Sequence, residues 1–365
     1  MGKSRVSLVD IARKTGYSVM SVSYALRNHP KIKESTRAAI RKTADEMGYV
    51  PDPDIVKLMT RIRMNQKIET RSFVAVIDLF EERKAFKADP YTNTLIASAE
   101  ERLEKLGYQM TRLPVFQPRL SPQRITSILQ SRGIEGVLLP PFPTELTSFR
   151  MDWEVVSLIC TEERFHDPGL NKVIPHHYSN MVLAMQKVRE LGYRRPGLVS
   201  CRNSLGRDNY AWFGAYYSYL RDRMEAEAIP PLPEGNDPRE MLAWYRRYEP
   251  DVIIVTEDWI LEAFLEAAGL RMPGDCGAIS ISADFGKLSG VKQCADIIGS
   301  AAADILTAHI IRNERGVPTH PKTMMIEGSW VDRGTVRPQG ESARAAKKIH
   351  AGRRQSPRQR TRAKA

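Results

Sequence analysis

Cysteines and long apolar runs are scarce in this chain of 365 residues, and their scarcity excludes several classes of protein. The four cysteines (Cys160, Cys201, Cys276 and Cys294) stand far apart without a CxxC pair, which argues against a disulfide framework or a zinc site. No apolar run approaches the length of a membrane span, and the N-terminal MGKSRVSLVD lacks the apolar core of a signal peptide. We therefore expect a cytoplasmic protein with reduced thiols and no membrane partner.

The short motifs of common enzymes are also missing. GxGxxG, GxxxxGK[ST], GxSxG and HExxH do not occur. His176 and His177 are adjacent, but neighbouring residues of a strand point to opposite faces, so the pair cannot easily hold one metal ion. The sequence predicts a protein that is not an enzyme and has no catalytic residue, metal or cofactor. A Ser, His, Asp triad assembled from distant segments stays open, without positive support.

Positive charge is concentrated at the two ends of the chain. Residues 1–65 carry 13 Lys/Arg against 6 Asp/Glu, and residues 341–365 carry 9 against 1. Because the net charge of the whole chain is +12, the segment between these ends is slightly acidic. Two basic ends around a nearly neutral middle suit a polyanion such as nucleic acid. For the C-terminal end, a basic surface that only aids solubility is an equal alternative.

Two short helices are predicted near the N-terminus. Ser7 and Asp10 form an [ST]xx[DE] capping box before a helix over about 8–14, and Gly16 supplies the turn that ends it. Ser18 caps the next helix, whose packing stripe is Val22, Ala25 and Leu26. The outward residues of that helix are then Val19, Met20, Ser23, Tyr24 and Arg27.

A third helix is predicted over about 34–47, with Ala38, Ile40, Ala44 and Met47 facing inward and Gly48 at its end. Three short helices with a glycine turn between the first two form a helix-turn-helix unit. Val19 and Met20 then stand where a recognition helix meets base edges in the major groove. The alternative, that these two residues cover an unpredicted core patch, stays open on the pattern alone.

The stretch SLVDIARKTGYSVMSVSYALRNHPKIKESTRAAIRKTADEMGYVPDPDIVKLM resembles the DNA-binding headpiece and hinge of LacI-type transcriptional regulators. The family pattern TxxDVAxxAGVSxxTVSRxLN, then VSxxTRxxV and LGYxPN, is matched over about fifty residues without a gap. This resemblance implies that Val19, Met20 and Tyr24 read bases. It places a further set at phosphates or the groove wall, namely Ser7, Ser18, Ser21, Arg27 and Thr36. The outward Ser23 is an additional DNA-binding candidate. Leu58 falls where the family inserts a hinge-helix leucine into the minor groove.

The headpiece and hinge also depart from the family pattern. Tyr24 replaces the common Arg, and Lys33 replaces a capping Ser. Asp52 and Asp54 lie in the hinge, where acids repel the DNA backbone unless they cap the hinge helix. The hinge contacts are therefore less well defined by the resemblance than those of the headpiece.

The middle of the chain alternates continuous apolar strands with helices, which predicts parallel sheets covered on both faces. Two such series imply an α/β fold with two subdomains, and the resemblance implies a doubly wound, periplasmic-binding-protein-like pair of lobes. The expected domains are a headpiece at 5–50, a hinge at 51–65, a ligand-binding and dimerisation domain at 70–337, and a basic, disordered tail at 338–365. The two lobes are expected at 70–161 plus 291–317 and at 167–285 plus 321–337, with chain crossings near 161–166, 285–291 and 317–321.

Ligand contacts are expected from the strand ends that line a cleft between the lobes, where open parallel sheets bind small molecules. Aromatic rings with acids and amides suit a sugar, because apolar ring faces stack while hydroxyls need fixed partners. Ordinary packing or a solvated loop is the alternative for each residue taken singly. The candidates are Tyr91, Asn93, His176, Arg207, Asn209, Trp212, Asp258 and Asp284.

These observations predict a sequence-specific transcriptional regulator, a repressor, that acts as a homodimer on a near-palindromic operator in double-stranded DNA at the bacterial nucleoid. A small ligand, expected to be a sugar, modulates its operator affinity, and the apolar helix over 295–313 is the candidate dimer surface. The rival prediction is an architectural DNA-binding protein without a ligand. A solute-binding receptor is disfavoured by the headpiece and by the lack of a signal peptide.

Overall fold

The computed structural model describes residues 6–27, 29–49, 72–78, 90–115, 120–141, 150–163, 168–200, 210–224, 228–232 and 237–340. By its contacts the chain divides into two compact units. Unit 1 comprises Met1–Ile174 and Ala295–Met324, and unit 2 comprises Pro175–Cys294 and Met325–Ala365. No helix in the described part of the chain combines the length and the apolar character that a membrane span requires.

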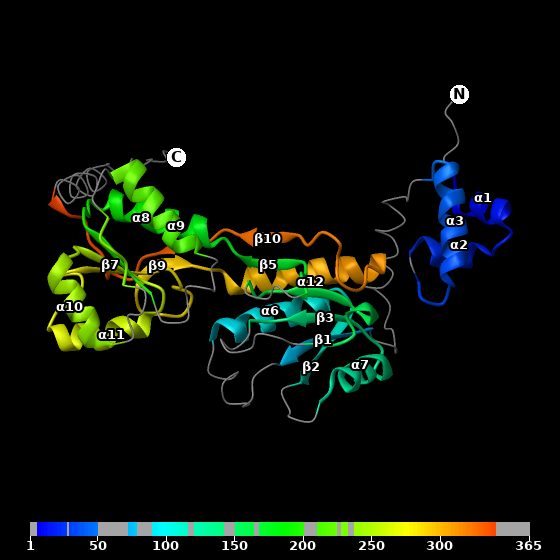
Figure 1. Cartoon of the computed structure of the whole chain (residues 1–365), viewed down its shortest axis with the longest axis horizontal. Helices are drawn as coiled ribbons and strands as arrows, with labels where there is room; N and C mark the ends of the chain where they lie inside the picture. The colour runs from blue at the N-terminus through cyan, green and yellow to red at the C-terminus, as the bar shows by residue number, and fades with distance from the viewer. Residues whose placement is uncertain are drawn as a thin grey trace, which may run out of the picture. The chain divides into compact units, whose positions relative to one another are not determined.

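Three helices form the N-terminal headpiece: α1 (Leu8–Thr15), α2 (Val19–Leu26) and α3 (Glu34–Glu46), drawn in blue in Figure 1. Each helix buries one stripe of residues three or four apart, because only those positions share a face of an α-helix. The buried apolar residues of the headpiece are Ile11, Ala12, Val22, Ala25, Ile40 and Ala44. The predicted helices and the packing stripe of α2 are thereby confirmed.

The capping signals of the headpiece are present as the sequence predicts. Ser7 and Asp10 form a complete capping box at the start of α1, and Gly16 ends that helix in the left-handed region at φ 74°. Ser18 caps α2 by accepting a hydrogen bond from the Ser21 amide. Lys33 stands at the cap position of α3 without a side-chain hydrogen bond to the helix, as expected where it replaces a capping Ser.

The prediction that Ala38 faces inward is wrong. Ala38 is exposed, whereas Ile40 and Ala44 are buried. Because residues two apart lie about 200° apart around a helix, a stripe that contains Ile40 turns Ala38 toward solvent. Thr36 stands one turn before Ile40 and is half-buried on the same side of α3.

Unit 1 contains a six-stranded sheet in the order β10-β5-β4-β3-β1-β2. Its strands are β1 (Ser72–Asp78), β2 (Tyr108–Pro114), β3 (Ile134–Leu139), β4 (Ser157–Cys160), β5 (Lys172–Pro175) and β10 (Thr323–Ile326). The pairs formed among β1 to β5 are all parallel. The central residues of β1, β3, β4 and β5 are mostly apolar and buried, as expected for strands covered on both faces, whereas the edge strand β2 is only partly buried.

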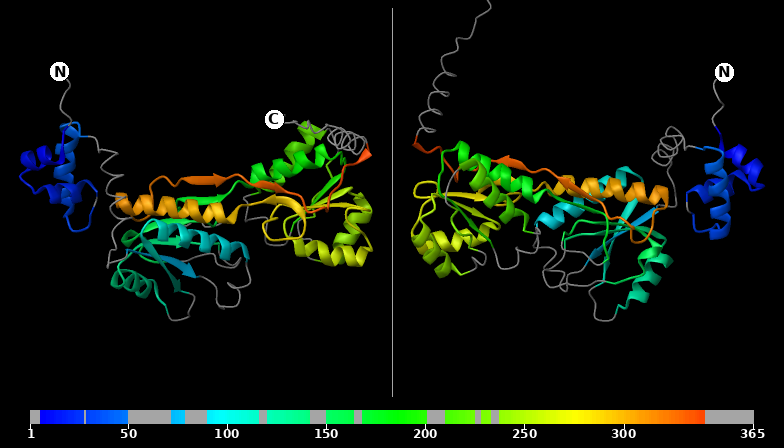
Figure 2. Two further views of the ribbon diagram at one scale, coloured as in Figure 1. Left: turned by 180° about the vertical axis from the view of Figure 1, so that it is seen from behind. Right: turned by 45° about the horizontal axis from the view of Figure 1, so that its top comes forward.

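The helices of unit 1 are α6 (Pro90–Lys105), α7 (Pro122–Ser131) and α12 (Ala295–Arg312), with a short 3₁₀ turn η1 (Trp153–Val155). The views of Figure 2 show α12 side by side with α6. A glycine permits this contact, since a Cβ atom on Gly299 would lie 2.0 Å from the carbonyl oxygen of Leu95. An ion pair between Arg102 Nε and Asp304 Oδ1, at 2.7 Å, joins the same two helices.

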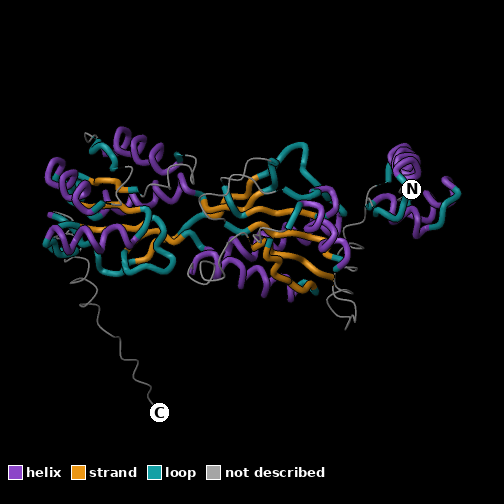
Figure 3. The backbone as a smooth tube through the Cα atoms, turned by 60° about the horizontal axis from the view of Figure 1, so that its bottom comes forward, coloured by secondary structure: helices purple, strands orange, loops and turns teal. Residues whose placement is uncertain are grey.

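Unit 2 contains a five-stranded sheet in the order β11-β9-β8-β7-β6. Its strands are β6 (Pro196–Val199), β7 (Val252–Val255), β8 (Gly277–Ser280), β9 (Ser289–Lys292) and β11 (Ser329–Val331). The pairs from β6 to β9 are parallel, and β11 runs antiparallel to β9. Figure 3 shows the strands of this sheet in orange with helices in purple beside them. The predicted α/β class, with two largely parallel sheets, is thus confirmed.

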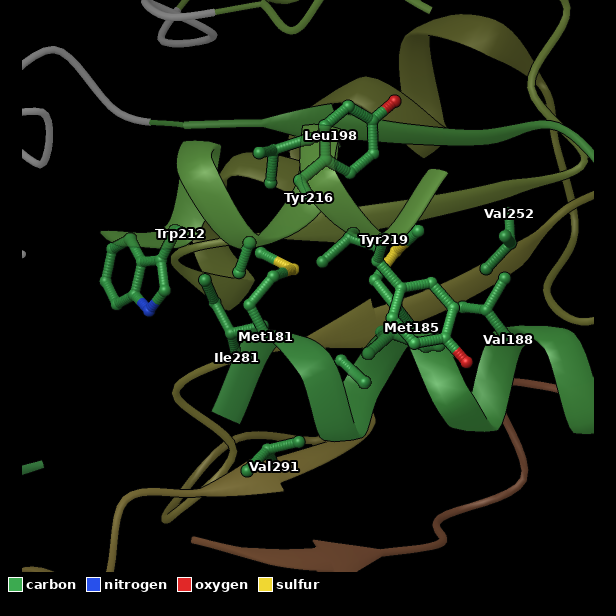
Figure 4. Packing of buried hydrophobic residues seen from close by; sticks show 14 of the residues in the cluster. Met181, Met185, Val188, Leu198, Trp212, Tyr216, Tyr219, Val252, Ile281 and Val291 are labelled. Atoms are coloured by element: carbon green, nitrogen blue, oxygen red, sulfur yellow. The ribbon is translucent and has the colours of Figure 1, made fainter. Parts of the chain in front are cut away.

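The helices of unit 2 are α8 (His177–Glu190), α9 (Ala211–Tyr219), a π-helical turn η2 (Leu220–Met224), α10 (Pro238–Tyr248) and α11 (Asp258–Ala268). One core cluster packs α8 and α9 against the sheet, with Met181, Met185 and Tyr216 among its buried side chains (Figure 4). The Tyr216 hydroxyl is also satisfied there, since it donates to the carbonyl of Pro196 or Ile229, 2.8 Å and 3.0 Å away. A second cluster, which includes Phe264, lies under α10 and α11.

The chain passes between the two units after residues 174, 294 and 324, later than the crossings expected near 161–166, 285–291 and 317–321. The lobe boundaries at 161, 167, 285 and 291 therefore need correction. Strand β5 pairs with β4 and keeps residues 172–174 in unit 1, while β9 pairs with β8 and keeps residues 289–292 in unit 2. Several expectations fall outside the described residues, namely the hinge over 51–65 with Leu58, the ligand candidates Arg207 and Asn209, and the tail beyond residue 340.

Candidate nucleic-acid interface and ligand-binding edge

The first turn of α2 carries two exposed apolar side chains. Val19 is 42% exposed and Met20 is 66% exposed, although both side chains are apolar. The opposite face of the helix explains this, because Val22 and Ala25 are fully buried in the headpiece core. Val19 and Met20 therefore do not cover a core patch within the headpiece. Their side chains are open to solvent at the start of α2.

The amino end of α2 is held by two serines. The Ser21 amide donates to Ser18 Oγ at 3.1 Å, and the two hydroxyl oxygens lie 2.9 Å apart. Capping fixes the first turn, where backbone amides and the helix dipole favour a negative charge. The same turn therefore combines exposed apolar side chains with a polar end that suits a phosphate.

Ser7 and Asp10 make reciprocal hydrogen bonds at the start of α1. The Ser7 amide donates to Asp10 Oδ2 at 3.0 Å, the Ser7 hydroxyl donates to the same oxygen at 2.6 Å, and the Asp10 amide donates to Ser7 Oγ at 3.3 Å. These hydrogen bonds hold the pKa of Asp10 below its ordinary value, because they stabilise the carboxylate. The cap thus fixes the Ser7 side chain at the edge of the headpiece.

The second turn of α2 carries Ser23 and Tyr24, and Arg27 follows as the C-cap residue. Arg27 is exposed, and its Nε donates to the Ser23 carbonyl oxygen at 3.0 Å while Nη2 donates to Ser23 Oγ at 2.9 Å. Tyr24 is half-buried beside them. The outward set predicted for this helix is therefore found on one side of it, and Thr36 is half-buried on α3.

The described headpiece is basic. Residues 6–49 contain eight Lys/Arg and four Asp/Glu. Most of the basic side chains are exposed, whereas Arg37 is half-buried and pairs with Glu34. A short, capped helix with apolar and polar side chains on its free face, in a basic three-helix unit, has the features that major-groove recognition requires.

In unit 2, two acids follow neighbouring parallel strands. Asp258 comes just after β7 and Asp284 just after β8, so both leave the sheet at its carboxyl-terminal edge. The Leu288 amide donates to Asp258 Oδ2 at 3.3 Å, and the Gln293 amide donates to Asp284 Oδ2 at 2.6 Å. This edge is where open parallel sheets bind small molecules.

The loop after β8 packs tightly on Asp258. A Cβ atom on Gly286 would lie 1.6 Å from Asp258 Oδ2, so a larger residue at this position would displace the carboxylate. The other oxygen, Oδ1, is buried and has no hydrogen-bond partner among the described residues. Since buried polar atoms are rarely left unpaired, Oδ1 is a candidate acceptor for a ligand hydroxyl.

The remaining ligand candidates lie in different surroundings. His176 caps α8, with Nδ1 accepting the Ser179 amide at 3.3 Å and Nε2 4.0 Å from Glu327 Oε1. Tyr91 and Asn93 are half-buried in the first turn of α6, in unit 1. Trp212 differs from the expectation of a ligand-facing ring.

Trp212 is only 2% exposed and belongs to the core cluster of unit 2. Its ring meets the His177 ring edge-on, with centroids 5.0 Å apart, and Figure 4 shows it at one end of the cluster. This burial corrects the expectation, because it favours a packing role for Trp212 over direct contact with a ligand.

Sequence reasoning missed two side chains that hold polar loops in place. Gln293 is buried, and its Nε2 donates to the Ile281 carbonyl at 3.2 Å and to Ser282 Oγ at 2.8 Å, next to the loop of Asp284. Lys172 starts β5 in unit 1, and its Nζ donates to the Glu163 carbonyl at 2.5 Å. Burial lowers the pKa of Lys172. No local pattern marks either residue, since a single Gln or Lys is ordinarily exposed.

A metal site is not part of this picture for the described residues, where no group of three His, Cys, Asp or Glu side chains could hold an ion. The buried thiols are also of low reactivity, since burial raises the pKa of Cys160 and of Cys276 to about 12.

Comparison with known proteins links these features to one family. Residues 7–52 match the model of "Bacterial regulatory proteins, lacI family". The sucrose operon repressor of Escherichia coli is 22% identical over 330 residues, which cover 85% of this chain and 95% of that protein. The transcriptional repressor CytR of Escherichia coli K12 is 22% identical over 205 residues, 54% of each chain.

Solved structures of the same kind share the fold. A complex of the transcriptional regulator CelR with cellobiose has a TM-score of 0.54 at 19% identity and covers 91% of this chain and 100% of that one. The Lac repressor dimer bound to operator and the anti-inducer ONPF has a TM-score of 0.52 at 16% identity and covers 92% and 100%. The capped headpiece, the two α/β units and these likenesses together support a LacI-type regulator.

Proposed function

We propose that this protein is a sequence-specific transcriptional repressor whose operator affinity is modulated by a small ligand. The observation that carries the proposal is the pair Val19 and Met20, exposed at the capped start of α2 while the opposite face is buried. Two apolar side chains held in solvent by a rigid helix need a partner surface, and the major groove supplies one in its thymine methyl groups. The protein acts on DNA in the cytoplasm, at the bacterial nucleoid.

In this proposal the headpiece divides its contacts between bases and backbone. Val19, Met20 and Tyr24 read base edges, and Leu58 in the hinge wedges into the minor groove. The hydroxyl, guanidinium and amide groups around them fix the register on the phosphates. The backbone-contacting set is Ser7, Ser18, Ser21, Ser23, Arg27 and Thr36.

The protein acts as a homodimer, so that two headpieces read the two halves of a near-palindromic operator. Helix α12 supports this part of the proposal. Ile297 on its first turn is 49% exposed, and Ala301 one turn later is half-buried, so the helix keeps an apolar strip outside its contact with α6.

The proposed ligand is a sugar, and its contacts in unit 2 lie at the carboxyl-terminal edge of the sheet. Support comes from Asp258, whose buried Oδ1 lacks a partner among the described residues, and from Asp284, which follows the neighbouring strand β8. His176, at the cap of α8, is a further proposed contact. In unit 1, Tyr91 offers an aromatic ring and Asn93 an amide to the sugar. Arg207 and Asn209 are proposed from the family pattern. Two of the similar proteins are a sucrose operon repressor and a regulator in complex with cellobiose.

Ligand and operator are coupled through the α/β units. If a sugar changes operator affinity by some factor, the operator changes sugar affinity by the same factor, because binding free energies are linked. Both signs of coupling are compatible with these residues, so the sugar acts as an inducer or as a corepressor.

Selection of DNA sites from a random pool by the purified chain, with and without a panel of sugars, tests the proposal. We expect a near-palindromic motif whose occupancy changes with one sugar. A pool without any enriched motif would contradict sequence-specific recognition and favour an architectural DNA-binding protein. A motif that no sugar affects would leave DNA recognition in place and remove the sugar from the proposal.

A further inference from the structure

The exposed end of α2 carries a cluster of an aromatic ring, a cation and an imidazole, formed by Tyr24, Arg27 and His29. The Tyr24 and His29 rings are stacked, with centroids 4.5 Å apart and planes 20° apart. The guanidinium carbon of Arg27 lies 5.6 Å from the Tyr24 ring centroid, within the range of a cation–π contact. Two neighbours therefore contact the ring that is proposed to read a base.

His29 is held in place independently of the ring stack. Its amide donates to the Tyr24 carbonyl oxygen at 2.9 Å, so the backbone folds back over the end of α2. Its Nδ1 accepts the Lys31 amide at 3.3 Å. A ring nitrogen that accepts a hydrogen bond carries no proton, so the proton of the neutral ring is on Nε2. The imidazole thus has a fixed position from which to support Tyr24.

The neutral form of His29 is favoured by its surroundings. Partial burial and the nearby charge of Lys31 lower the pKa of His29. A neutral ring stacks on an aromatic neighbour without bringing a second cation next to Arg27.

Arg27 is held in place by Ser23, which precedes it by one turn of the helix. Its two hydrogen bonds to Ser23, from Nε at 3.0 Å and from Nη2 at 2.9 Å, span one helical turn and hold the side chain along α2. Side chains as long as arginine ordinarily lose conformational entropy when they are fixed. Here the loss occurs in the free protein, before DNA binds.

We propose that His29 is a positioning residue for base recognition: with Arg27 it holds the Tyr24 ring in one orientation, so that the hydroxyl-bearing edge of Tyr24 discriminates one operator position. This inference rests on the proposed function of α2. Since stacking covers a face of the ring, the edge and the hydroxyl remain for DNA, and the hydroxyl can donate to or accept from a base. Fixing the ring beforehand removes an ordering cost that otherwise weakens discrimination.

The test uses the full chain and compares base-preference profiles from selected DNA pools. Two variants of His29 separate its two contacts. His29→Phe keeps an aromatic ring but has no acceptor for the Lys31 amide, whereas His29→Asn keeps a side-chain acceptor but has no ring to stack. Tyr24→Phe removes only the hydroxyl and thus identifies the operator position that Tyr24 reads.

We expect Tyr24→Phe and His29→Asn to reduce discrimination at the same operator position by about 2- to 10-fold, the factor that corresponds to one aromatic pair. His29→Phe should keep most of the discrimination. Positions that respond to Met20→Ala should be unchanged in all three variants, which sets a positioning role apart from general weakening of the headpiece.

Three results would overturn the inference. Unchanged discrimination in His29→Asn would mean that Tyr24 needs no support from the ring. Loss of discrimination in His29→Phe but not in His29→Asn would assign the effect to the hydrogen bond with the Lys31 amide. An equal loss of base discrimination at every operator position, together with a lower melting temperature, would mean that His29 has only a structural role. If the unaltered chain selects no motif, the proposed function fails first, so the two failures are distinguishable.

Discussion

The headpiece and unit 2 differ in how they present their candidate functional groups. The headpiece has six buried apolar residues, and its outward side chains follow the period of a single helix. Unit 2 has two larger core clusters, and its candidate groups follow separate strands that only the sheet brings to one edge. The comparison teaches that a site on one helix face is set by local periodicity, whereas a site at a sheet edge depends on contacts between distant segments.

Core truncation should have the largest effects and should separate the two regions. Phe264→Ala in unit 2 and Ile40→Ala in the headpiece each remove a fully buried side chain, at a cost of about 3–5 and about 2–5 kcal/mol in unfolding free energy. Ile40→Ala should abolish operator binding while the α/β units still melt normally by calorimetry. If Ile40→Ala shifted every transition equally, the headpiece would not be an independent unit.

A glycine substitution tests the ligand-binding edge more selectively. Gly286→Ala places a methyl group against Asp258 Oδ2, and such overpacking typically costs about 1–3 kcal/mol. We expect the response to sugar to weaken while operator affinity without sugar is kept, as measured by fluorescence anisotropy.

Gly214→Ala is the matched control for this substitution. Gly214 lies within α9, and a Cβ atom there has no heavy atom within 4 Å. Replacing a helical glycine by alanine should stabilise the chain by up to about 1 kcal/mol and leave the sugar response unchanged. Equal loss of the response in both variants would contradict the role of the Asp258 contact.

The exposed residue Met20 should affect recognition without affecting stability. Met20→Ala should cost about 1–3 kcal/mol in operator binding and relax base preference at a symmetric pair of positions. The melting temperature should stay the same, because the side chain is 66% exposed. An unaltered preference in a site selection would remove Met20 from the interface.

Helix caps provide a smaller, paired comparison. Ser18→Ala and Ser121→Ala each remove a side-chain cap, on α2 and α7 respectively, at about 1 kcal/mol of stability. Only Ser18→Ala should also weaken operator binding, because α7 packs on the sheet of unit 1 and is not part of the headpiece. A similar loss of binding in Ser121→Ala would mean that stability alone explains both results.

The smallest effect is expected from pH. The hydrogen bonds from Ser7 hold the pKa of Asp10 below its ordinary value, so the carboxylate stabilises the headpiece above its unfolded-state pKa. This contribution is lost as the pH falls through the folded-state pKa. As the pH is lowered from about 5 to about 2, the melting temperature of the headpiece should fall less steeply in Asp10→Asn than in the unaltered chain. Parallel slopes would show that the cap does not titrate.

Much of the headpiece could be predicted because its signals are local. The capping box of Ser7 and Asp10, the stop at Gly16 and the buried pair Val22 and Ala25 each depend on residues within one or two turns. Ala38 was the exception, since the inward side of α3 is chosen by contacts with the other two helices.

Unit 2 could be predicted in class but less well in detail. The alternation of apolar strands with helices predicted the α/β class, but strands β9 and β11 and their antiparallel pairing could not be predicted, because three or four residues give too little periodicity and the pairing partners lie far along the chain. Trp212 was expected at a ligand and lies in the core, since an aromatic ring near a strand end serves either place. The tether from Gln293 to Ser282 arises only through tertiary contact.

Reciprocal linkage between operator and sugar tests the central claim most directly. Operator affinity is measured with and without the sugar that alters site selection, and the affinity for that sugar is measured with and without the operator. A ligand-modulated repressor predicts the same factor, different from one, in both directions. A factor of one in both directions, for a sugar shown to bind, would contradict the coupling of the two α/β units to the headpiece.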